Sequence, residues 1–167
     1  SMPKTMEWIE KLKQESKKNG TVGCVVLDKQ GNLTAGTSTG GMFKKRWGRI
    51  GDSPVIGAGT YADNNSCAVS CTGHGEYFIR HAVAFDVCAR YKYLKESVEK
   101  AADYIIHTEL NTNAGNGGLI AVDKLGNIAM PYNSGGMFRG FLYKEKGSPE
   151  IKKGCGIGKK IVVVGEK

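Results

Sequence analysis

Long hydrophobic runs are missing from this chain. No stretch of 18 consecutive apolar residues occurs in its 167 residues, so the sequence predicts no membrane-spanning helix. A secretory signal, with a basic start and a short apolar run, is also missing ahead of the first expected strand. We therefore expect a cytoplasmic protein that does not bind a membrane.

Metal-ligand spacings are missing as well. The five cysteines and three histidines match no zinc pattern, so we expect no metal at the site and no cofactor. An odd number of cysteines cannot all pair, and free, mostly buried thiols fit a reducing compartment. The cysteines are Cys24, Cys67, Cys71, Cys88 and Cys155.

A basic stripe of the kind that binds nucleic acid is the third absence. The net charge is +8, but residues 1–20 contribute +2 and residues 144–167 contribute +4, which leaves only +2 for the 123 residues between them. The lysine-rich ends therefore indicate solvated termini, and we expect no nucleic-acid partner. A basic module that binds acidic surfaces through these ends remains an alternative without a specific motif.

What the chain does have is glycine, 24 residues of it, placed between apolar strands where tight turns and close backbone approach need it. The length suits one domain. We divide the chain into a weakly helical leader at 1–20, with a helix over 4–18, a central unit at 21–143 and a basic C-terminal tail at 144–167.

Two similar hairpins mark the central unit. A strand over 21–27, a turn over 28–32 and a strand over 33–38 form the first hairpin. Residues 23–43 align without gaps on residues 118–138, and nine of the 21 positions are identical. The pattern predicts two antiparallel β-layers. Convergence on the same turn residues would explain the turn, but not the Gly-Gly-Met-Phe that ends both copies.

Other elements follow from hydrophobic spacing. Strands are expected over 54–58, 66–71 and 139–143, with an isolated strand-like run over 161–164. Helices are expected over 75–91 and 95–109. The first of them is apolar on more than one side, which predicts that it is sandwiched between layers. Glu96 and Lys100 should form an i,i+4 pair on the second.

Gly20 and Thr21 carry a possible chemistry. If the peptide bond between them were cut, Thr21 would hold a hydroxyl nucleophile and a free α-amine, with a pKa of about 7.7–8.0, on one residue. A glycine and a threonine at a strand start are usually only a strand start, so this dipeptide alone predicts little.

Further polar residues could complete a site. Thr39 ends the hairpin that Thr21 begins, so their hydroxyls can be neighbours. Thr72 and Gly73 sit where a strand meets a helix, a place where N–H groups suit an oxyanion. Each also has an ordinary structural interpretation, as a sheet threonine or a turn glycine.

Arg49 and Asp52 would form a clamp for a zwitterion. A guanidinium binds a carboxylate, and a carboxylate binds an ammonium group. An arginine three residues from an aspartate is also a common surface pair, so the spacing by itself leaves both interpretations open.

Taken together, five motifs in order closely resemble the β-subunit of plant-type L-asparaginases, also called isoaspartyl peptidases, which are N-terminal-nucleophile hydrolases. The resemblance runs from about residue 20 to residue 140. The motifs are Thr21-Val22-Gly23, Thr37-Ser38-Thr39-Gly40-Gly41, the run from Gly48 to Pro54, the run from Gly57 to Asp63, and the run from Ser70 to Glu76.

The resemblance implies an α+β fold, a four-layer αββα sandwich, and roles for individual residues. Thr21 would be the nucleophile, freed by self-cleavage after Gly20 and assisted by Thr39. Arg49 and Asp52 would hold the α-carboxylate and α-amine of the substrate, with Gly75 helping at the amine. The oxyanion hole would be made by Thr72 and Gly73. The implied reaction hydrolyses the side-chain amide of L-asparagine or the bond of β-aspartyl dipeptides.

The resemblance also implies partners. Family precursors carry an α-subunit before the nucleophile, whereas only 20 residues precede Thr21 here. We expect an α-subunit of the same precursor as partner, a dimer of αβ units, and any structural monovalent cation in that α-part. The alternatives are an inert, unprocessed or truncated fragment in which Gly20 still acylates Thr21, and a relative of glycosylasparaginase or threonine aspartase.

Overall fold

The computed structural model of this chain describes residues 20–42, 45–144, 148, 150–156 and 161–166. For residues 155, 156 and 161–166 it describes the backbone alone. The leader helix expected over 4–18 lies outside the described residues.

Nine described strands form two sheets. Sheet A has five strands in the order β2 (Leu33–Thr39), β1 (Thr21–Leu27), β9 (Ile161–Glu166), β7 (Arg139–Lys144) and β8 (Ile151–Gly156). Sheet B has four strands in the order β3 (Thr60–Ala62), β4 (Cys67–Gly73), β5 (Gly117–Asp123) and β6 (Ile128–Ala129).

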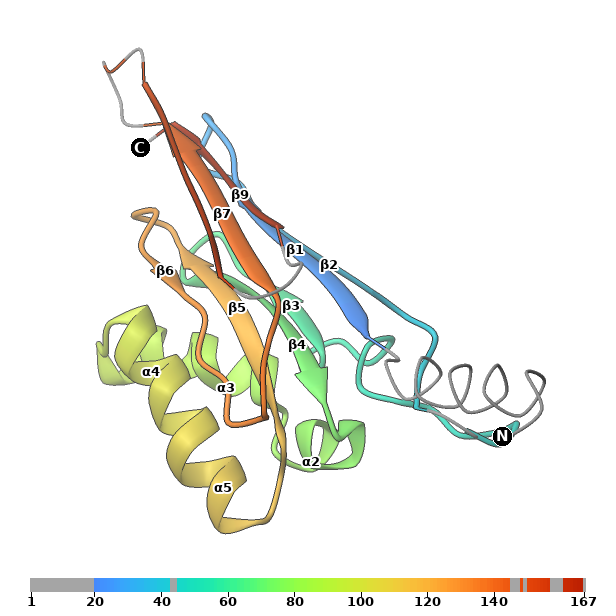
Figure 1. Ribbon diagram of the computed structural model, residues 1–167. Coiled ribbons are helices and arrows are strands. Elements are labelled where there is room, and N and C mark those ends of the chain that lie inside the picture. The colour runs from blue at the N-terminus through green and yellow to red at the C-terminus, as the bar shows by residue number, and fades with distance from the viewer. Residues whose placement is uncertain (1–19, 43–44, 145–147, 149, 157–160, 167) are drawn as a thin grey trace, which may run out of the picture.

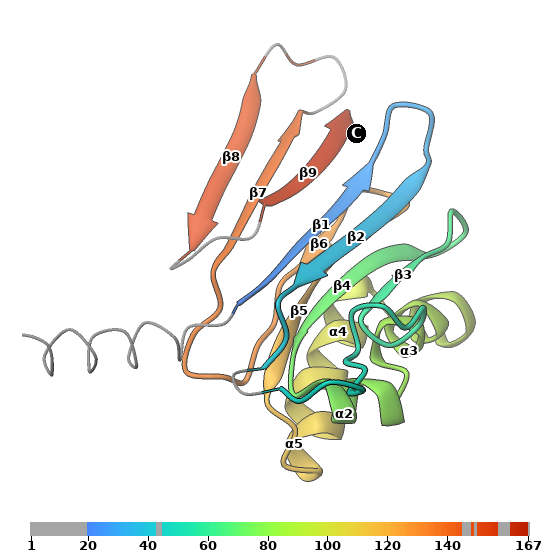
Figure 2. The same ribbon diagram turned by 90° about the vertical axis from the view of Figure 1, so that its right-hand side faces the viewer.

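The sheets and helices form layers. The helices gather on one face of sheet B, and β1 and β2 lie against its other face (Figure 1 and Figure 2). Strand β4 shows the consequence, because successive side chains point to opposite faces. Val69 joins the core under the helices, whereas Ala68 joins the core between the sheets, and both are fully buried. Both faces of β4 and β5 are therefore apolar.

The two predicted hairpins contain the same turn. Asp28 accepts hydrogen bonds through Oδ1 from the backbone N–H groups of Gln30 and Asn32, at 2.9 and 2.7 Å. Asp123 accepts the equivalent bonds from Leu125 and Asn127, at 2.9 and 2.8 Å. The Asn32 side chain, which donates to Asp28 Oδ2 at 2.8 Å, and the backbone N–H groups of Asn32 and Gln30 hold the pKa of Asp28 below its usual value. The internal repeat is thus confirmed as a repeated structure, although β6 is only two residues long.

Sheet A corrects the prediction of two antiparallel layers. Strand β9 pairs in parallel with both β1 and β7, so sheet A is mixed, whereas sheet B is antiparallel throughout. The strand expected over 161–164 is present but is not isolated, because β9 lies between β1 and β7. The strand expected over 139–143 is confirmed as β7.

The helix expected over 75–91 is interrupted. It forms α2 (Gly75–Arg80), α3 (Val83–Ala89) and a π-helical turn η1 (Arg90–Leu94). Ala82 adopts a left-handed conformation with φ of 45°, and the first N–H groups of α3 turn to the carbonyls of residues 57 and 58. A helix start needs such acceptors, and this loop supplies them from outside the helix. Phe85 is 44% exposed, so α3 is an outer layer and is not sandwiched as predicted.

The second predicted helix begins later than expected. Ser97 caps α4 (Val98–Tyr104) by accepting a hydrogen bond from the N–H of Lys100 at 3.2 Å, and η2 (Ile105–Glu109) and α5 (Leu110–Thr112) continue it. The predicted pair of Glu96 and Lys100 is confirmed at 3.3 Å. Within the described part of the chain, we find no helix with the length and apolar character needed to span a membrane.

The prediction of a strand over 54–58 is wrong. These residues form consecutive turns, and the backbone carbonyl of Asp52 accepts hydrogen bonds from the N–H groups of Val55 and Gly59 at 3.0 and 3.1 Å. Gly57 has a φ of 91°, a left-handed conformation that suits glycine. Pro54 has no N–H to give to a sheet. Only Ile56 makes a bridge, to Thr60.

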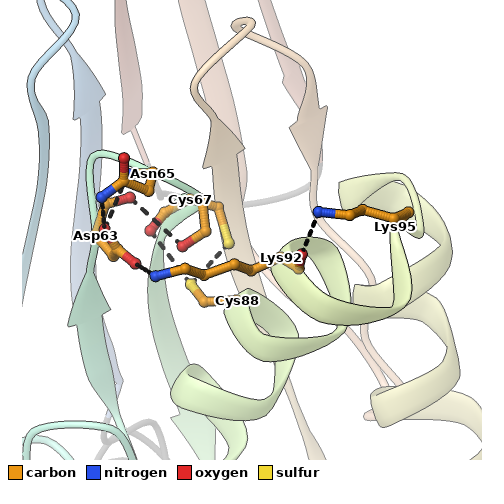
Figure 3. Close-up of polar contacts among 7 residues, drawn as sticks. Asp63, Asn65, Cys67, Cys88, Lys92 and Lys95 are labelled. Carbon is orange, nitrogen blue, oxygen red and sulfur yellow. Dashed lines mark hydrogen bonds and ion pairs between the residues drawn. The ribbon is translucent and has the colours of Figure 1, made fainter.

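Two thiols and an ion pair connect α3 and η1 to sheet B (Figure 3). The sulfurs of Cys67 on β4 and Cys88 on α3 lie 2.7 Å apart, and the Cys88 thiol also donates to the Cys67 carbonyl at 3.2 Å. Nearby, Lys92 Nζ contacts Asp63 Oδ2 at 3.0 Å. The predicted buried thiols are confirmed for Cys67, Cys71 and Cys88, whereas Cys24 is partly exposed.

Cys67 should make the protein sensitive to alkali. The hydrogen bond with Cys88, together with burial, raises the pKa of the Cys67 thiol. In the unfolded chain a thiol has a pKa of about 8.5, so above this pH the unfolded state binds fewer protons than the folded state. The free energy of unfolding should then fall by up to about 1.4 kcal/mol per pH unit. Denaturant titrations at pH 8, 9 and 10 measure this slope.

The matched variants are Cys67→Ala and Cys24→Ala. The first should flatten the alkaline slope, because it removes the ionising group. The second, on the partly exposed side of β1, should keep the slope of the parent protein. Equal slopes for all three proteins would contradict the prediction.

Candidate active site

The first hairpin brings two threonine hydroxyls together. Thr21 and Thr39 are opposite each other in the β1–β2 register, at the open end of the hairpin. The Thr21 hydroxyl donates to Thr39 Oγ1 at 3.2 Å, and the N–H of Gly41 donates to the same oxygen at 3.0 Å. Thr39 is thereby held in place by its own loop. Gly20 directly precedes this pair and is exposed.

The end of β4 comes very close to the start of β5. Gly73 and Gly117 are cross-strand partners. A Cβ on Gly73 would lie 2.3 Å from the carbonyl oxygen of Asn116, and one on Gly117 would lie 2.2 Å from that of Thr72. Only glycine allows this approach. It fixes the turn at Thr72 and Gly73 at the point where the chain enters α2.

Asp52 lies in a narrow slot between two glycines. Asp52 is only 7% exposed. A Cβ on Gly75 would lie 2.8 Å from Asp52 Oδ1, and a Cβ on Gly59 would lie 2.6 Å from its backbone carbonyl oxygen. The turns formed by residues 54–59 surround Asp52, because the N–H groups of Val55 and Gly59 bind its backbone carbonyl. The position of the Asp52 carboxylate is therefore set by the loop and by the start of α2.

Arg49 reaches the same region from the other side. Its Nη2 contacts Glu76 Oε2 at 2.9 Å, and its side chain is 32% exposed. The pKa of Glu76 is held below its usual value, chiefly by a hydrogen bond from its own backbone N–H and further by Arg49. Because the pair is exposed, it contributes little stability. The guanidinium can therefore serve an incoming carboxylate at small cost.

All seven residues that the sequence predicted for catalysis or substrate binding line one pocket of about 980 Å³. They are Thr21, Thr39, Arg49, Asp52, Thr72, Gly73 and Gly75. The volume is ample for an amino acid or a dipeptide. The chain thus brings a hydroxyl pair, a guanidinium and a carboxylate into one cavity, and their roles remain predictions.

Sequence reasoning missed other lining residues. Ser134 is the clearest case, since the internal repeat aligns it with Thr39, and both line the pocket. Asn116 and His74 come from the close approach of β4 and β5, where the N–H of His74 donates to the Asn116 carbonyl at 2.9 Å. The repeat could have identified Ser134. No signal in the sequence pointed to Asn116.

Comparison with known proteins adds to this geometry. A family model described as asparaginase matches residues 2–151. The chain is 54% identical over 129 residues to an isoaspartyl peptidase of Salmonella typhimurium, covering 77% of this chain and 41% of that protein. It is 49% identical over 143 residues to an isoaspartyl peptidase of Escherichia coli, covering 80% and 44%.

Plant and animal proteins match as well. A probable isoaspartyl peptidase/L-asparaginase 2 of Arabidopsis thaliana is 53% identical over 120 residues, covering 72% of this chain and 36% of that protein. The chain spans less than half the length of these curated relatives. The family match, which extends over most of the sequence, agrees with the predicted resemblance, and this chain belongs to the asparaginase family.

Proposed function

We propose that this chain carries the nucleophile and most of the substrate contacts of an amidohydrolase that cleaves the side-chain amide of L-asparagine and the isopeptide bond of β-aspartyl dipeptides. The observation that carries the proposal is the contact of 3.2 Å between the hydroxyls of Thr21 and Thr39, in the pocket that also holds Arg49 and Asp52. Relatives from Arabidopsis thaliana and Mus musculus are named as isoaspartyl peptidase/L-asparaginase, which covers both substrates.

Self-cleavage would come first. The Thr21 hydroxyl attacks the Gly20 carbonyl carbon, the peptide C–N bond breaks, and the Thr21 nitrogen leaves as an amine that takes up the hydroxyl proton. Water then hydrolyses the resulting ester, which leaves a carboxylate on Gly20 and a free α-amine on Thr21. Thr39 supports this step by accepting a hydrogen bond from the attacking hydroxyl.

Hydrolysis of substrate would follow the same route. The free amine of Thr21 accepts the proton of its own hydroxyl, whose oxygen attacks the side-chain carbonyl carbon of the substrate. Thr72 and Gly73 stabilise the oxyanion, and the C–N bond breaks as the leaving nitrogen takes the proton. Water hydrolyses the β-aspartyl ester, releasing aspartate and restoring the hydroxyl. No cofactor takes part in these steps, because the amine is the base.

The clamp would choose the substrate. Arg49 binds the α-carboxylate and the Asp52 carboxylate binds the α-ammonium group, with Gly75 beside it. Both groups are present on a free amino acid or an N-terminal β-aspartyl residue, and neither is present inside a polypeptide. The clamp therefore favours L-asparagine and β-aspartyl dipeptides over an endopeptidase substrate of the threonine-aspartase kind.

We also propose a partner for sheet A. The relatives are more than twice as long as the regions that match. Val22, on the face of β1 turned away from sheet B, is 63% exposed. An α-part of the same precursor would cover this face and complete a four-layer αββα sandwich, and αβ units would pair into dimers. The proposed setting is the cytoplasm.

Intact mass under denaturing conditions tests the function. Fresh protein and protein kept for days at 37 °C are compared, and a fragment that begins at Thr21 is expected to accumulate from the 18.0 kDa chain. The same chain held in guanidinium should stay uncut, because cleavage needs the folded hairpin. Ammonia released from L-asparagine then reports turnover.

A single uncut species without ammonia release would favour the second candidate. This candidate is an inert form in which Gly20 still acylates Thr21, and it is supported by the short coverage of the relatives. Adding an α-part from a relative and repeating the ammonia assay would then separate a missing partner from a missing nucleophile.

A further inference from the structure

Three hydroxyls meet between the two sheets at the edge of the pocket, which Thr37 itself lines. Thr37 on β2 lies with its Oγ1 2.7 Å from the Oγ of Ser70 on β4. The same Thr37 oxygen accepts a hydrogen bond from the hydroxyl of Thr60 on β3. Thr37 Oγ1 also donates to the carbonyl of Gly59 at 3.3 Å. One side chain of sheet A thus contacts Ser70 on β4 and the adjacent residues Gly59 and Thr60 at the start of β3.

The hydrogen-bonding capacity of Thr37 is fully used. A hydroxyl has one proton and two lone pairs. Thr37 Oγ1 faces the Gly59 carbonyl as a donor and accepts from Thr60, and in its contact with Ser70 either hydroxyl can donate. Ser70 is fully buried, and a buried donor without an acceptor is costly. Thr37 is therefore the hydrogen-bond partner on which the buried Ser70 hydroxyl depends.

Thr37 and two of its partners, Ser70 and Gly59, each connect to a different part of the candidate site. Thr37 is two residues before Thr39, on the same face of β2. Ser70 is two residues before Thr72, on the same face of β4. Gly59, the other partner of Thr37, gives its N–H to the Asp52 carbonyl at 3.1 Å. Thr37 and its hydrogen bonds therefore link the hydroxyl pair, the proposed oxyanion hole and the proposed ammonium-binding loop.

We propose that Thr37 is a positioning residue for this site, which sets the distance between the attacking hydroxyl, the oxyanion hole and Asp52. The inference rests on the proposed function. It assigns the effect to the hydroxyl and not to the volume of the side chain, because valine has the same shape but forms no hydrogen bond with Ser70 or Gly59. Misplacement by about 1 Å lowers turnover by up to about 100-fold.

Thr37→Val and Thr37→Ser are the test pair, and Thr34→Val is the matched control, an exposed threonine on the same strand. Turnover of L-asparagine gives kcat and KM. Hydrogen–deuterium exchange of the purified chain reports the amides of Gly59 and Cys71, because the Cys71 N–H donates to the Gly59 carbonyl at 2.8 Å.

Thr37→Val is expected to lower kcat by about 10- to 100-fold and to speed exchange at residues 57–60 and 70–73. Thr37→Ser should stay within about threefold of the parent, and so should Thr34→Val. If Thr37→Val does not fold, Ser70→Ala removes a single donor and should lower kcat in the same direction by a smaller factor.

Two outcomes would overturn the inference. If Thr37→Val has the kcat and the exchange rates of the parent, Thr37 does not position the site. If Thr37→Ser loses as much kcat as Thr37→Val, the effect comes from packing and not from the hydroxyl. A parent protein that shows no turnover even after an α-part from a relative has been added would instead defeat the proposed function. In that case the exchange data alone decide whether Thr37 holds β2, β4 and the loop at Gly59 together.

Discussion

Thr21→Ala is expected to abolish turnover, with a loss of about 10⁴-fold or more, and to leave the bond after Gly20 uncut. The variant removes the proposed nucleophile for both reactions, and Thr39 lacks an amine of its own to replace it. Stability should change by only about 1 kcal/mol, because Thr21 is partly exposed and loses a single hydroxyl contact. Intact mass, ammonia release and thermal unfolding measure the three effects.

Thr21→Ser is the matched control for this prediction. It keeps the hydroxyl and the backbone nitrogen, so cleavage should continue at a reduced rate. Cleavage and ammonia release in Thr21→Ala at rates close to those of the parent would contradict the assignment of the nucleophile and, with it, the proposed function.

Gly75→Ala should weaken substrate binding strongly. The new methyl group would lie 2.8 Å from Asp52 Oδ1 and 3.0 Å from the Asp52 nitrogen, so the carboxylate or its loop must shift. The carboxylate cannot move away freely, because Gly59 closes the opposite side of the slot. We expect kcat/KM to fall by about 100-fold, about 2.7 kcal/mol, with most of the change in KM.

Gly36→Ala controls for a general effect of adding a methyl group. Gly36 lies on β2, and nothing lies within 4 Å of the Cβ it would gain. Its kinetics should match those of the parent. If Gly75→Ala raises KM no more than Gly36→Ala does, Asp52 does not bind the ammonium group in the way proposed.

The hydroxyl pair was predictable from the sequence because it depends on local geometry. A turn over 28–32 fixes the register of its hairpin, and this register places Thr39 opposite Thr21. The same reasoning explains the second turn at Asp123. Short-range rules were sufficient wherever the partners lay within one hairpin or one helical turn, as for Glu96 and Lys100.

The slot around Asp52 was not predictable in this way. It depends on the left-handed Gly57, on Gly59 and on Gly75, which meet only after the loop has folded against α2. The interruption at Ala82 has the same origin, since the carbonyls that start α3 come from the loop at 57–58. Local propensity favoured a strand and a continuous helix there, and long-range hydrogen bonds overrode both.

The repeated hairpin divides two tasks between two copies of one pattern. Met42 in the first copy is 42% exposed and lines the pocket, whereas its counterpart Met137 is 5% exposed in the core between the sheets. At this methionine position, the first copy can therefore vary to suit a ligand while the second preserves the framework. Changes at the same repeat position should alter specificity in the first hairpin and folding in the second.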